Sequence, residues 1–281
     1  MQKTITYLYP DVTKASSLKV FQDRTNQIRA FYFTRDHIKD VEKLEMGTNY
    51  AVYFLFNEAE DNEITKVYIG QSTTGAKRML AHERSKRFWS YCIMFVTDNN
   101  SFDAMTIDFI EYYFIDKLRN SSAFILENKD LRSEPNISIF DKPNLMAYID
   151  QIEFLLKAEG IEFNELKISE SNDFYYPKNN RFKARIFVQD GRFVLHSGSY
   201  IRRPIESARN WSDGGKFYNR YTEIIDDLLQ DNKIVEANGY YQTLVNLSFK
   251  TPSMIASLIS GNAENGWLFF ENLAQLRQSR G

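Results

Sequence analysis

An arginine and a histidine on one expected helix are among the residues best suited to chemistry in this chain. Arg78 and His82 are four positions apart, so in a helix they project from the same side. The planar guanidinium of an arginine suits a phosphate group, and a histidine beside it could orient a tyrosine or contact the same phosphate. The alternative is a solvated basic helix face, because lysines and arginines surround both residues.

Glu111 is the second candidate because it interrupts the apolar sequence SFDAMTIDFIEYYFIDKLRN. A buried, ionised carboxylate without a partner costs several kcal/mol, so Glu111 must have a partner or reach a pocket. A salt bridge to Lys66 or Lys117 would satisfy it without any functional role.

Other basic residues are candidates for contacts to a nucleic-acid backbone. They fall in two groups: Lys77, Lys86 and Arg87 beside Arg78, and Arg202 and Arg203 in the sequence SGSYIRR. The same residues would equally suit an ordinary soluble surface.

The elements that must position these side chains begin with a β-hairpin over residues 17–34 and a short helix that starts at Thr34. Two further strands, NYAVYFLF and KVYIG, form a hairpin in which Ala51, Tyr53 and Leu55 share one face. We then expect a helix over 76–88 and a strand over 89–98. Two further helices should follow, one over 101–120 capped by Ser101 and one over 144–160.

The polar, turn-rich residues 163–181 mark a boundary between two domains. Beyond it we expect paired strands joined by an Asp190-Gly191 turn and a helix over 216–235. A hairpin over 239–250 and a helix with Thr251 as N-cap and Pro252 at its first position should follow.

Composition excludes several classes of protein. The chain has 281 residues, 43% hydrophobic and 26% charged, which fits two globular units rather than a disordered chain. No apolar run is long enough for a membrane span or a secretory signal, so we expect a cytoplasmic protein. The single cysteine, Cys92, cannot form an internal disulfide, and His37 and His196 have no companion at metal-ligand spacing.

The net charge of −2 argues against a protein that coats nucleic acid, because nonspecific phosphate binding requires a basic excess. Residues 171–281 carry 14 basic against 11 acidic residues, so any nucleic acid must be held by local patches.

The sequences AVYFL and VYIGQS, read with the residues that follow them, resemble the GIY-YIG nuclease family. Arg78 lies ten positions beyond Tyr68, His82 lies four beyond Arg78, and Glu111 and Asn128 come later in the order of that pattern. Asn136 in SEPNIS is an alternative position for the asparagine. Ala51 stands where the pattern has its first glycine, a strand position at which alanine should be tolerated.

The second half of the chain resembles the DUF4357 domain, which follows the nuclease domain in a bacterial subgroup of GIY-YIG proteins. The matching sequences are FVLHSGS at 193–199 and LSFKTPSMIASLISGNAENGW at 247–267. Together the two resemblances span nearly the whole chain.

The resemblance implies a role for each residue of the pattern. Tyr53 would accept the proton of the attacking water, and Tyr68 would position that water or share the task. Because a tyrosine pKa of about 10 makes a poor base at neutral pH, Arg78 and a metal would have to lower it. Glu111 would hold one divalent ion, Mg²⁺ or Mn²⁺.

Arg78 would clamp the scissile phosphate, His82 would orient a tyrosine or contact phosphate, and Asn128 would hydrogen-bond near the metal or the leaving group.

The implied architecture is α+β. A hairpin and helix over 1–45 lead into the GIY-YIG-type domain over 46–165, which would be a small antiparallel sheet flanked by helices. A smaller α+β DUF4357-like domain covers 180–281. The expected function is a metal-dependent DNA endonuclease in restriction, defence or repair, with RNA as an alternative substrate. Cutting both strands would favour a homodimer. The competing expectation is a noncatalytic nucleic-acid or protein-binding module that keeps the nuclease scaffold.

Overall fold

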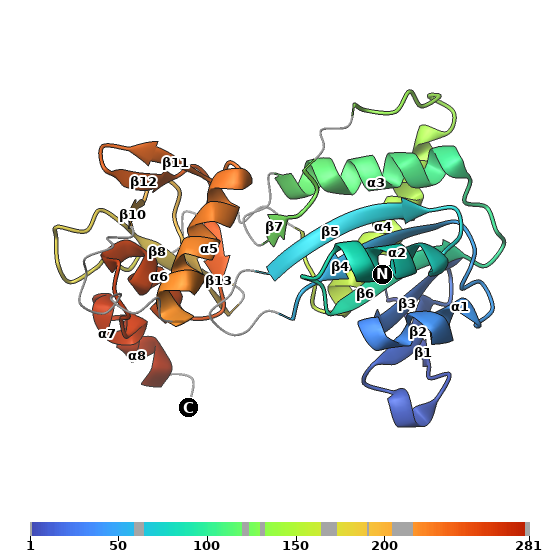
Figure 1. Ribbon diagram of the computed structural model, residues 1–281, viewed down its shortest axis with the longest axis horizontal. Coiled ribbons are helices and arrows are strands. Elements are labelled where there is room, and N and C mark those ends of the chain that lie inside the picture. The colour runs from blue at the N-terminus through green and yellow to red at the C-terminus, as the bar shows by residue number, and fades with distance from the viewer. Residues whose placement is uncertain are drawn as a thin grey trace. The chain divides into compact units, whose positions relative to one another are not determined.

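In the computed structural model the chain divides into two units, each described below by itself (Figure 1). Unit 1 comprises Met1–Glu58, Lys66–Arg119 and Leu126–Phe163, and unit 2 comprises Ala59–Thr65, Asn120–Ile125 and Asn164–Gly281. The structure describes residues 2–58, 65–119, 124–129, 133–163, 173–189, 191–203 and 216–278, without the side chains of 84, 85, 216, 217, 277 and 278.

A seven-stranded sheet with the order β1-β2-β3-β6-β4-β5-β7 forms the frame of unit 1. Its pairs from β1 to β5 are antiparallel. The strands are β1 (Ile5–Leu8), β2 (Leu18–Asp23), β3 (Ile28–Thr34), β4 (Ala51–Phe56), β5 (Thr65–Ser72), β6 (Tyr91–Thr97) and β7 (Phe124–Leu126).

Helices lie on both faces of this sheet, which explains why every residue of the interior strand β4 is buried. The helical elements are η1 (Val12–Lys14), η2 (Arg35–His37), α1 (Ile38–Glu42), α2 (Lys77–Ser85), α3 (Ala104–Arg119) and α4 (Lys142–Ala158). On one face Tyr53 and Leu55 pack with Val41 of α1 and Met79 of α2. On the other, Phe54 meets Phe114 of α3 edge-on, with ring centroids 5.1 Å apart.

Several elements of unit 1 confirm the sequence expectations, and others correct them. The hairpins β2–β3 and β4–β5 form as expected, and the mixed α+β class is confirmed. Ser101 was wrong as the cap of α3, because the Asp103 carboxylate accepts the Thr106 N–H at 2.7 Å. Helix α4 begins before Pro143, and β1 and β7 are strands that the sequence did not predict.

Unit 2 contains two three-stranded sheets, β13-β9-β8 and β10-β12-β11. Its strands are β8 (Ile186–Gln189), β9 (Arg192–Leu195), β10 (Tyr200–Arg202), β11 (Ile234–Ala237), β12 (Tyr240–Thr243) and β13 (Leu247–Phe249), and its helices are α5 (Lys216–Gln230), α6 (Pro252–Ser260), α7 (Gly266–Phe269) and α8 (Leu273–Gln278). Helix α6 is buried along almost its whole length, and α5 adds Tyr221 and Leu228 to the same core.

The expected hairpin over 239–250 is wrong, because its two strands belong to different sheets. Strand β12 pairs with β11 and β10, whereas β13 pairs with β9. The hairpin is instead β11–β12, closed by Asn238 and Gly239, whose φ angles of 52° and 81° suit a tight two-residue turn. Helix α6 does begin after Thr251 with Pro252 in its first turn, and Gly261 ends it with φ 74°.

Candidate functional site

Two tyrosines on adjacent strands form the base of the candidate site. In the β4–β5 register Tyr53 lies opposite Gly70 and Leu55 lies opposite Tyr68, so the two tyrosines are diagonal neighbours on one face. Their ring centroids are 6.4 Å apart. Tyr53 is only 1% exposed, whereas Tyr68 is half-buried. Tyr68 is therefore the more accessible of the two residues.

Gly70 has a steric role in this arrangement. A Cβ atom placed on Gly70 would lie 2.3 Å from both Cζ and the hydroxyl oxygen of Tyr53. The Tyr53 ring therefore lies directly over the backbone of β5. Because residue 70 of the VYIG sequence is a glycine, β5 leaves room for the Tyr53 ring of the adjacent strand β4.

Helix α2 brings His82 against both tyrosines. The Tyr53 hydroxyl lies 2.7 Å from His82 Nε2, and the His82 ring lies 5.4 Å from that of Tyr68. Burial, followed by the positive charges of Arg78 and Lys86, lowers the pKa of His82 to about 4, so the imidazole is neutral at pH 7. Its Nδ1 is buried and has no hydrogen-bond partner among the described residues.

The two cations near this cluster, Arg78 and Lys86, differ in their surroundings. The Arg78 side chain is exposed and has no ion-pair or hydrogen-bond partner in the part of the chain that the structure describes. After burial, its charge contributes to the lowered pKa of His82, and it offsets part of the rise that burial causes in the pKa of Tyr53, so it lies within electrostatic range of both. The Lys86 ammonium lies over the Tyr68 ring, 3.9 Å from its centroid.

Glu111 of α3 is 3% exposed. Burial raises the pKa of Tyr53 well above its ordinary value, and the charge of Glu111 raises it further, which places this carboxylate within range of the tyrosine cluster. The two lysines considered as its salt-bridge partners each bind another glutamate. Lys117 contacts Glu153 at 2.5 Å, and Lys66 lies 3.9 Å from Glu127.

Asn128 holds the backbone of β5. Its Nδ2 donates to the Ile69 carbonyl at 2.7 Å, and its Oδ1 accepts the Ile69 N–H at 2.9 Å. Both ends of the amide are thus engaged one residue from Tyr68, which makes Asn128 a positioning residue for this strand. The alternative, Asn136, is exposed.

Asp108 belongs to the same region and was missed by the sequence analysis. It precedes Glu111 by one helical turn on α3, and its carboxylate accepts Gln71 Nε2 at 2.8 Å. Gln71 follows Gly70 on β5. The signal in the sequence was the i, i+3 spacing of the two carboxylates in DFIE.

The expected nucleic-acid contacts fall into two classes. Lys77 and Arg87 are exposed on or just after α2. Arg202 and Arg203 in unit 2 are instead engaged within the protein: Arg202 Nη1 donates to the Ser260 carbonyl at 3.2 Å, and Arg203 pairs with Glu236 and lies over a tyrosine ring. These two arginines help to hold unit 2 together.

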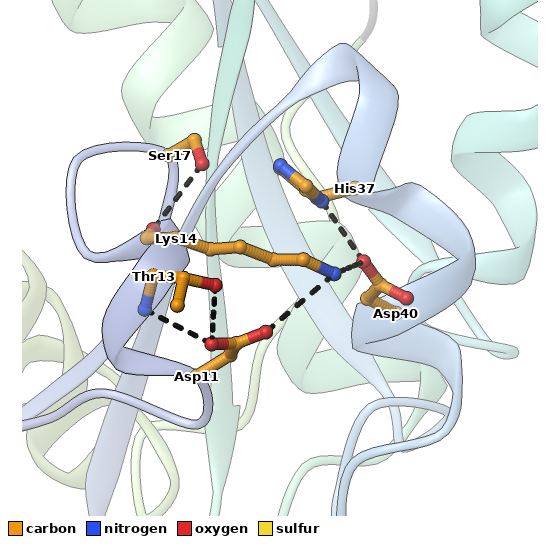
Figure 2. Close-up of polar contacts among 6 residues, drawn as sticks. All are labelled: Asp11, Thr13, Lys14, Ser17, His37 and Asp40. Atoms are coloured by element: carbon orange, nitrogen blue, oxygen red, sulfur yellow. Dashed lines mark hydrogen bonds and ion pairs between the residues drawn. The ribbon is translucent and has the colours of Figure 1, made fainter.

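A separate polar cluster joins η1 to α1 (Figure 2). The Asp40 carboxylate binds Lys14 Nζ at 2.8 Å and His37 Nδ1 at 2.9 Å, while Asp11 accepts from the N–H and hydroxyl of Thr13. The hydrogen bonds from Lys14 and His37 lower the pKa of Asp40 to about 2. This cluster accounts for His37 as a structural residue.

The donor set suits a divalent ion that takes most of its ligands from water and substrate. No group of three or more histidine, cysteine, aspartate or glutamate side chains is arranged as a metal site within the described residues. Mg²⁺, however, is commonly held by one or two carboxylates together with waters and substrate phosphates. The buried Glu111 fits that requirement.

No helix in the described part of the chain is long and apolar enough to cross a membrane.

Comparison with known proteins assigns one segment of the chain. No curated protein and no solved structure matches this sequence, and the comparisons give no evidence for a GIY-YIG nuclease domain. Residues 174–274 match the family model described as "Domain of unknown function (DUF4357)". The chain therefore contains a DUF4357 domain at residues 174–274.

Proposed function

We propose that unit 1 is a metal-dependent endonuclease that hydrolyses phosphodiester bonds in DNA, built on a GIY-YIG-like scaffold. One observation carries the proposal: Tyr53, Tyr68 and His82 pack together near an exposed Arg78 that has no partner among the described residues, and Glu111 is within electrostatic range. Hydrolysis needs a deprotonated water, neutralisation of charge on the phosphate and help for the leaving oxygen. This group of side chains contains a candidate for each need.

Arg78 binds the scissile phosphate. Its planar fork matches two phosphate oxygens, and it has no protein partner among the described residues that would have to be displaced. Because it is anchored on α2 next to His82, it can lie close to the tyrosines without being buried.

Tyr68, rather than Tyr53, accepts the proton of the attacking water. Tyr53 is buried and its raised pKa disfavours the phenolate that a base requires, and its hydroxyl is already bound to His82. Tyr68 is half-buried, and the Lys86 ammonium lies over its ring, 3.9 Å from the centroid. Tyr53 and His82 then position Tyr68.

Glu111 holds the divalent ion. When bound, Mg²⁺ neutralises charge on the phosphate and stabilises the departing oxygen. Asn128 contributes indirectly, because it fixes the strand that carries Tyr68.

The test is cleavage of supercoiled plasmid, single-stranded DNA and RNA in Mg²⁺ with EDTA controls. We expect Glu111→Ala and Arg78→Ala each to reduce cleavage by about 100-fold or more. Lys39→Ala, which removes an exposed cation of α1 that is not among the expected nucleic-acid contacts, is the control and should retain activity. Tyr68→Phe should lose about 100-fold and Tyr53→Phe much less.

Absence of cleavage of every substrate, with wild type and Glu111→Ala binding DNA equally, would support a noncatalytic binding module instead. A larger loss for Tyr53→Phe than for Tyr68→Phe would restore Tyr53 as the base. Light scattering with and without DNA tests the homodimer.

A further inference from the structure

A pocket in the DUF4357 domain has the chemistry of a nucleotide site. It has a volume of about 290 Å³, and all its described lining residues belong to unit 2. That volume is near the lower end of the roughly 300–1,000 Å³ typical of small-molecule sites. The pocket therefore suits a ligand of about the size of one nucleotide.

The cations of the pocket, Arg181 and Lys183, enter from the segment before β8. Both are exposed, and neither has an ion-pair partner among the described residues. The Arg181 guanidinium lies over the ring of Phe182, 4.7 Å from its centroid. None of the described lining residues is acidic, so an anionic ligand meets positive charge here without a competing carboxylate.

The aromatic side of the pocket is built by the sheet β10-β12-β11. Tyr200 and Tyr240 lie with their rings nearly perpendicular, 86° apart, and with centroids separated by 5.9 Å. Tyr240 is 46% exposed, so its ring is accessible to a ligand. A flat ligand ring placed against one tyrosine would meet the other edge-on, an arrangement that aromatic pairs favour.

The remaining lining residues supply a hydrogen-bonding group and an apolar floor. Asn238 stands in the tight turn between β11 and β12 with φ 52°, beside Tyr240, and its amide can both donate and accept. Ile259 of α6 is 2% exposed and closes the pocket from below.

The pocket is also held rigidly. The Tyr200 N–H donates to the Lys183 carbonyl at 2.8 Å, which ties the cationic segment to β10. Phe182 packs against Phe269 of α7 at 5.3 Å, and its N–H donates to the Asn179 carbonyl. A site formed by such tied elements needs little ordering when a ligand binds.

We propose that this pocket binds one nucleotide, with its base against Tyr200 and Tyr240 and its phosphate on Arg181 and Lys183. Stacking against aromatic rings combined with cations along the backbone is how proteins hold unpaired nucleotides. The inference rests on the proposed function, because the nucleic-acid substrate of unit 1 would supply the nucleotide. A free mononucleotide has the same chemistry, and the test separates the two sources.

The test is calorimetric titration of the full chain in EDTA, which prevents metal-dependent cleavage. The probes are 5′-dAMP, deoxyadenosine, inorganic phosphate and a short single-stranded oligonucleotide. We expect 5′-dAMP or the oligonucleotide to bind more tightly than deoxyadenosine or phosphate alone. Binding of 5′-dAMP would indicate a free nucleotide as ligand, and binding of the oligonucleotide only would indicate a strand.

Two pairs of matched variants localise the binding. Lys183→Ala and Tyr240→Ala should each weaken it about tenfold. Lys178 and Tyr176 are an exposed lysine and an exposed tyrosine of the same unit, outside the described lining of the pocket. Lys178→Ala and Tyr176→Ala should therefore leave nucleotide binding unchanged. Equal binding by all four variants would overturn the inference. So would equal affinities for 5′-dAMP or the oligonucleotide on one side and deoxyadenosine or phosphate alone on the other.

The plasmid assay separates this inference from the proposed function. Metal-dependent cleavage without nucleotide binding in the titration would refute the pocket and leave the nuclease intact. Binding that is lost in Lys183→Ala and Tyr240→Ala, in a protein that cleaves nothing, would support the pocket and refute the nuclease.

Discussion

At the scale of single residues, the candidate site depends on close contacts rather than on many charges. Gly70 is the clearest case, because the ring of Tyr53 occupies the space that any side chain would need. His82 is the second case, since it is buried as a neutral group between two tyrosines and two cations. Both residues therefore help to determine where the tyrosine rings lie.

Replacing Gly70 by alanine tests the first of these contacts. The added methyl group would lie 2.3 Å from Tyr53, so we expect Gly70→Ala to destabilise the protein by about 1–3 kcal/mol and to reduce activity. Urea denaturation measures the stability. In a Tyr53→Leu background the same substitution should cost clearly less, and equal costs in both backgrounds would contradict the contact.

The neutral state of His82 predicts a dependence of stability on pH. Its pKa is about 4 in the folded protein and about 6.5 unfolded, so the unfolded state binds more protons between these values. Stability from this residue is complete above about pH 6.5 and falls as the pH decreases towards 4. Unfolding free energies at pH 7, 6 and 5 should decline less steeply for His82→Gln than for wild type; parallel curves would refute this.

At the scale of elements, Glu127 and Asn128, which follow β7, stabilise the edge of β5 in unit 1. Glu127 N–H donates to the Val67 carbonyl at 2.8 Å, and Asn128 makes both of its hydrogen bonds to Ile69. These hydrogen bonds hold the outer side of the strand that carries Tyr68.

Removing the Asn128 amide should therefore affect both stability and activity. Asn128→Ala leaves the N–H and carbonyl of Ile69 without these partners, at a cost of about 1–3 kcal/mol. If Asn128 only positions β5, kcat should fall severalfold while the metal dependence stays unchanged. Asn128→Asp keeps the acceptor but not the donor and should give an intermediate loss; a shifted Mg²⁺ requirement would indicate direct metal contact instead.

The elements also show what the sequence could and could not predict. Alternation of side chains in AVYFL was enough to place Ala51, Tyr53 and Leu55 on one face, whereas the place of Tyr68 beside Tyr53 depends on the register of β4 with β5. Local signals failed where two similar candidates competed: Asp103 caps α3 instead of Ser101, and the Asn238-Gly239 turn forms the hairpin. The bonds of Asn128 and the pairing of Arg203 with Glu236 join residues distant in sequence, which no local pattern reveals.

At the scale of the whole molecule, the proposed activities are divided between two units with separate cores. The tyrosine cluster lies entirely in unit 1, and the nucleotide pocket lies in unit 2. All the residues of the unit 2 core cluster except Ile125 lie between Ile186 and Leu273. A core contained in 88 consecutive residues is large enough to fold alone.

The start of that domain can be located from its hydrogen bonds. Tyr175 pairs with Ile186 through two backbone hydrogen bonds of 2.8 and 2.9 Å, the Tyr176 carbonyl accepts the Glu271 N–H at 2.8 Å, and Lys178 N–H donates to the Phe269 carbonyl at 3.0 Å. These bonds attach residues 175–178 to β8 and to the end of α7. A domain that begins at residue 180 loses all four of them.

We therefore expect a fragment of residues 173–281 to unfold cooperatively in urea, and a fragment of residues 180–281 to be less stable. Four backbone hydrogen bonds at roughly 0.5–1.5 kcal/mol each predict a difference of about 2–6 kcal/mol, enough to unfold a marginal domain. Circular dichroism during urea titration measures both fragments. Equal urea midpoints for the two fragments would mean that residues 175–178 are not part of the folding unit. A noncooperative transition of the longer fragment would mean that unit 2 needs residues 120–125 to fold, which include Ile125 of its core.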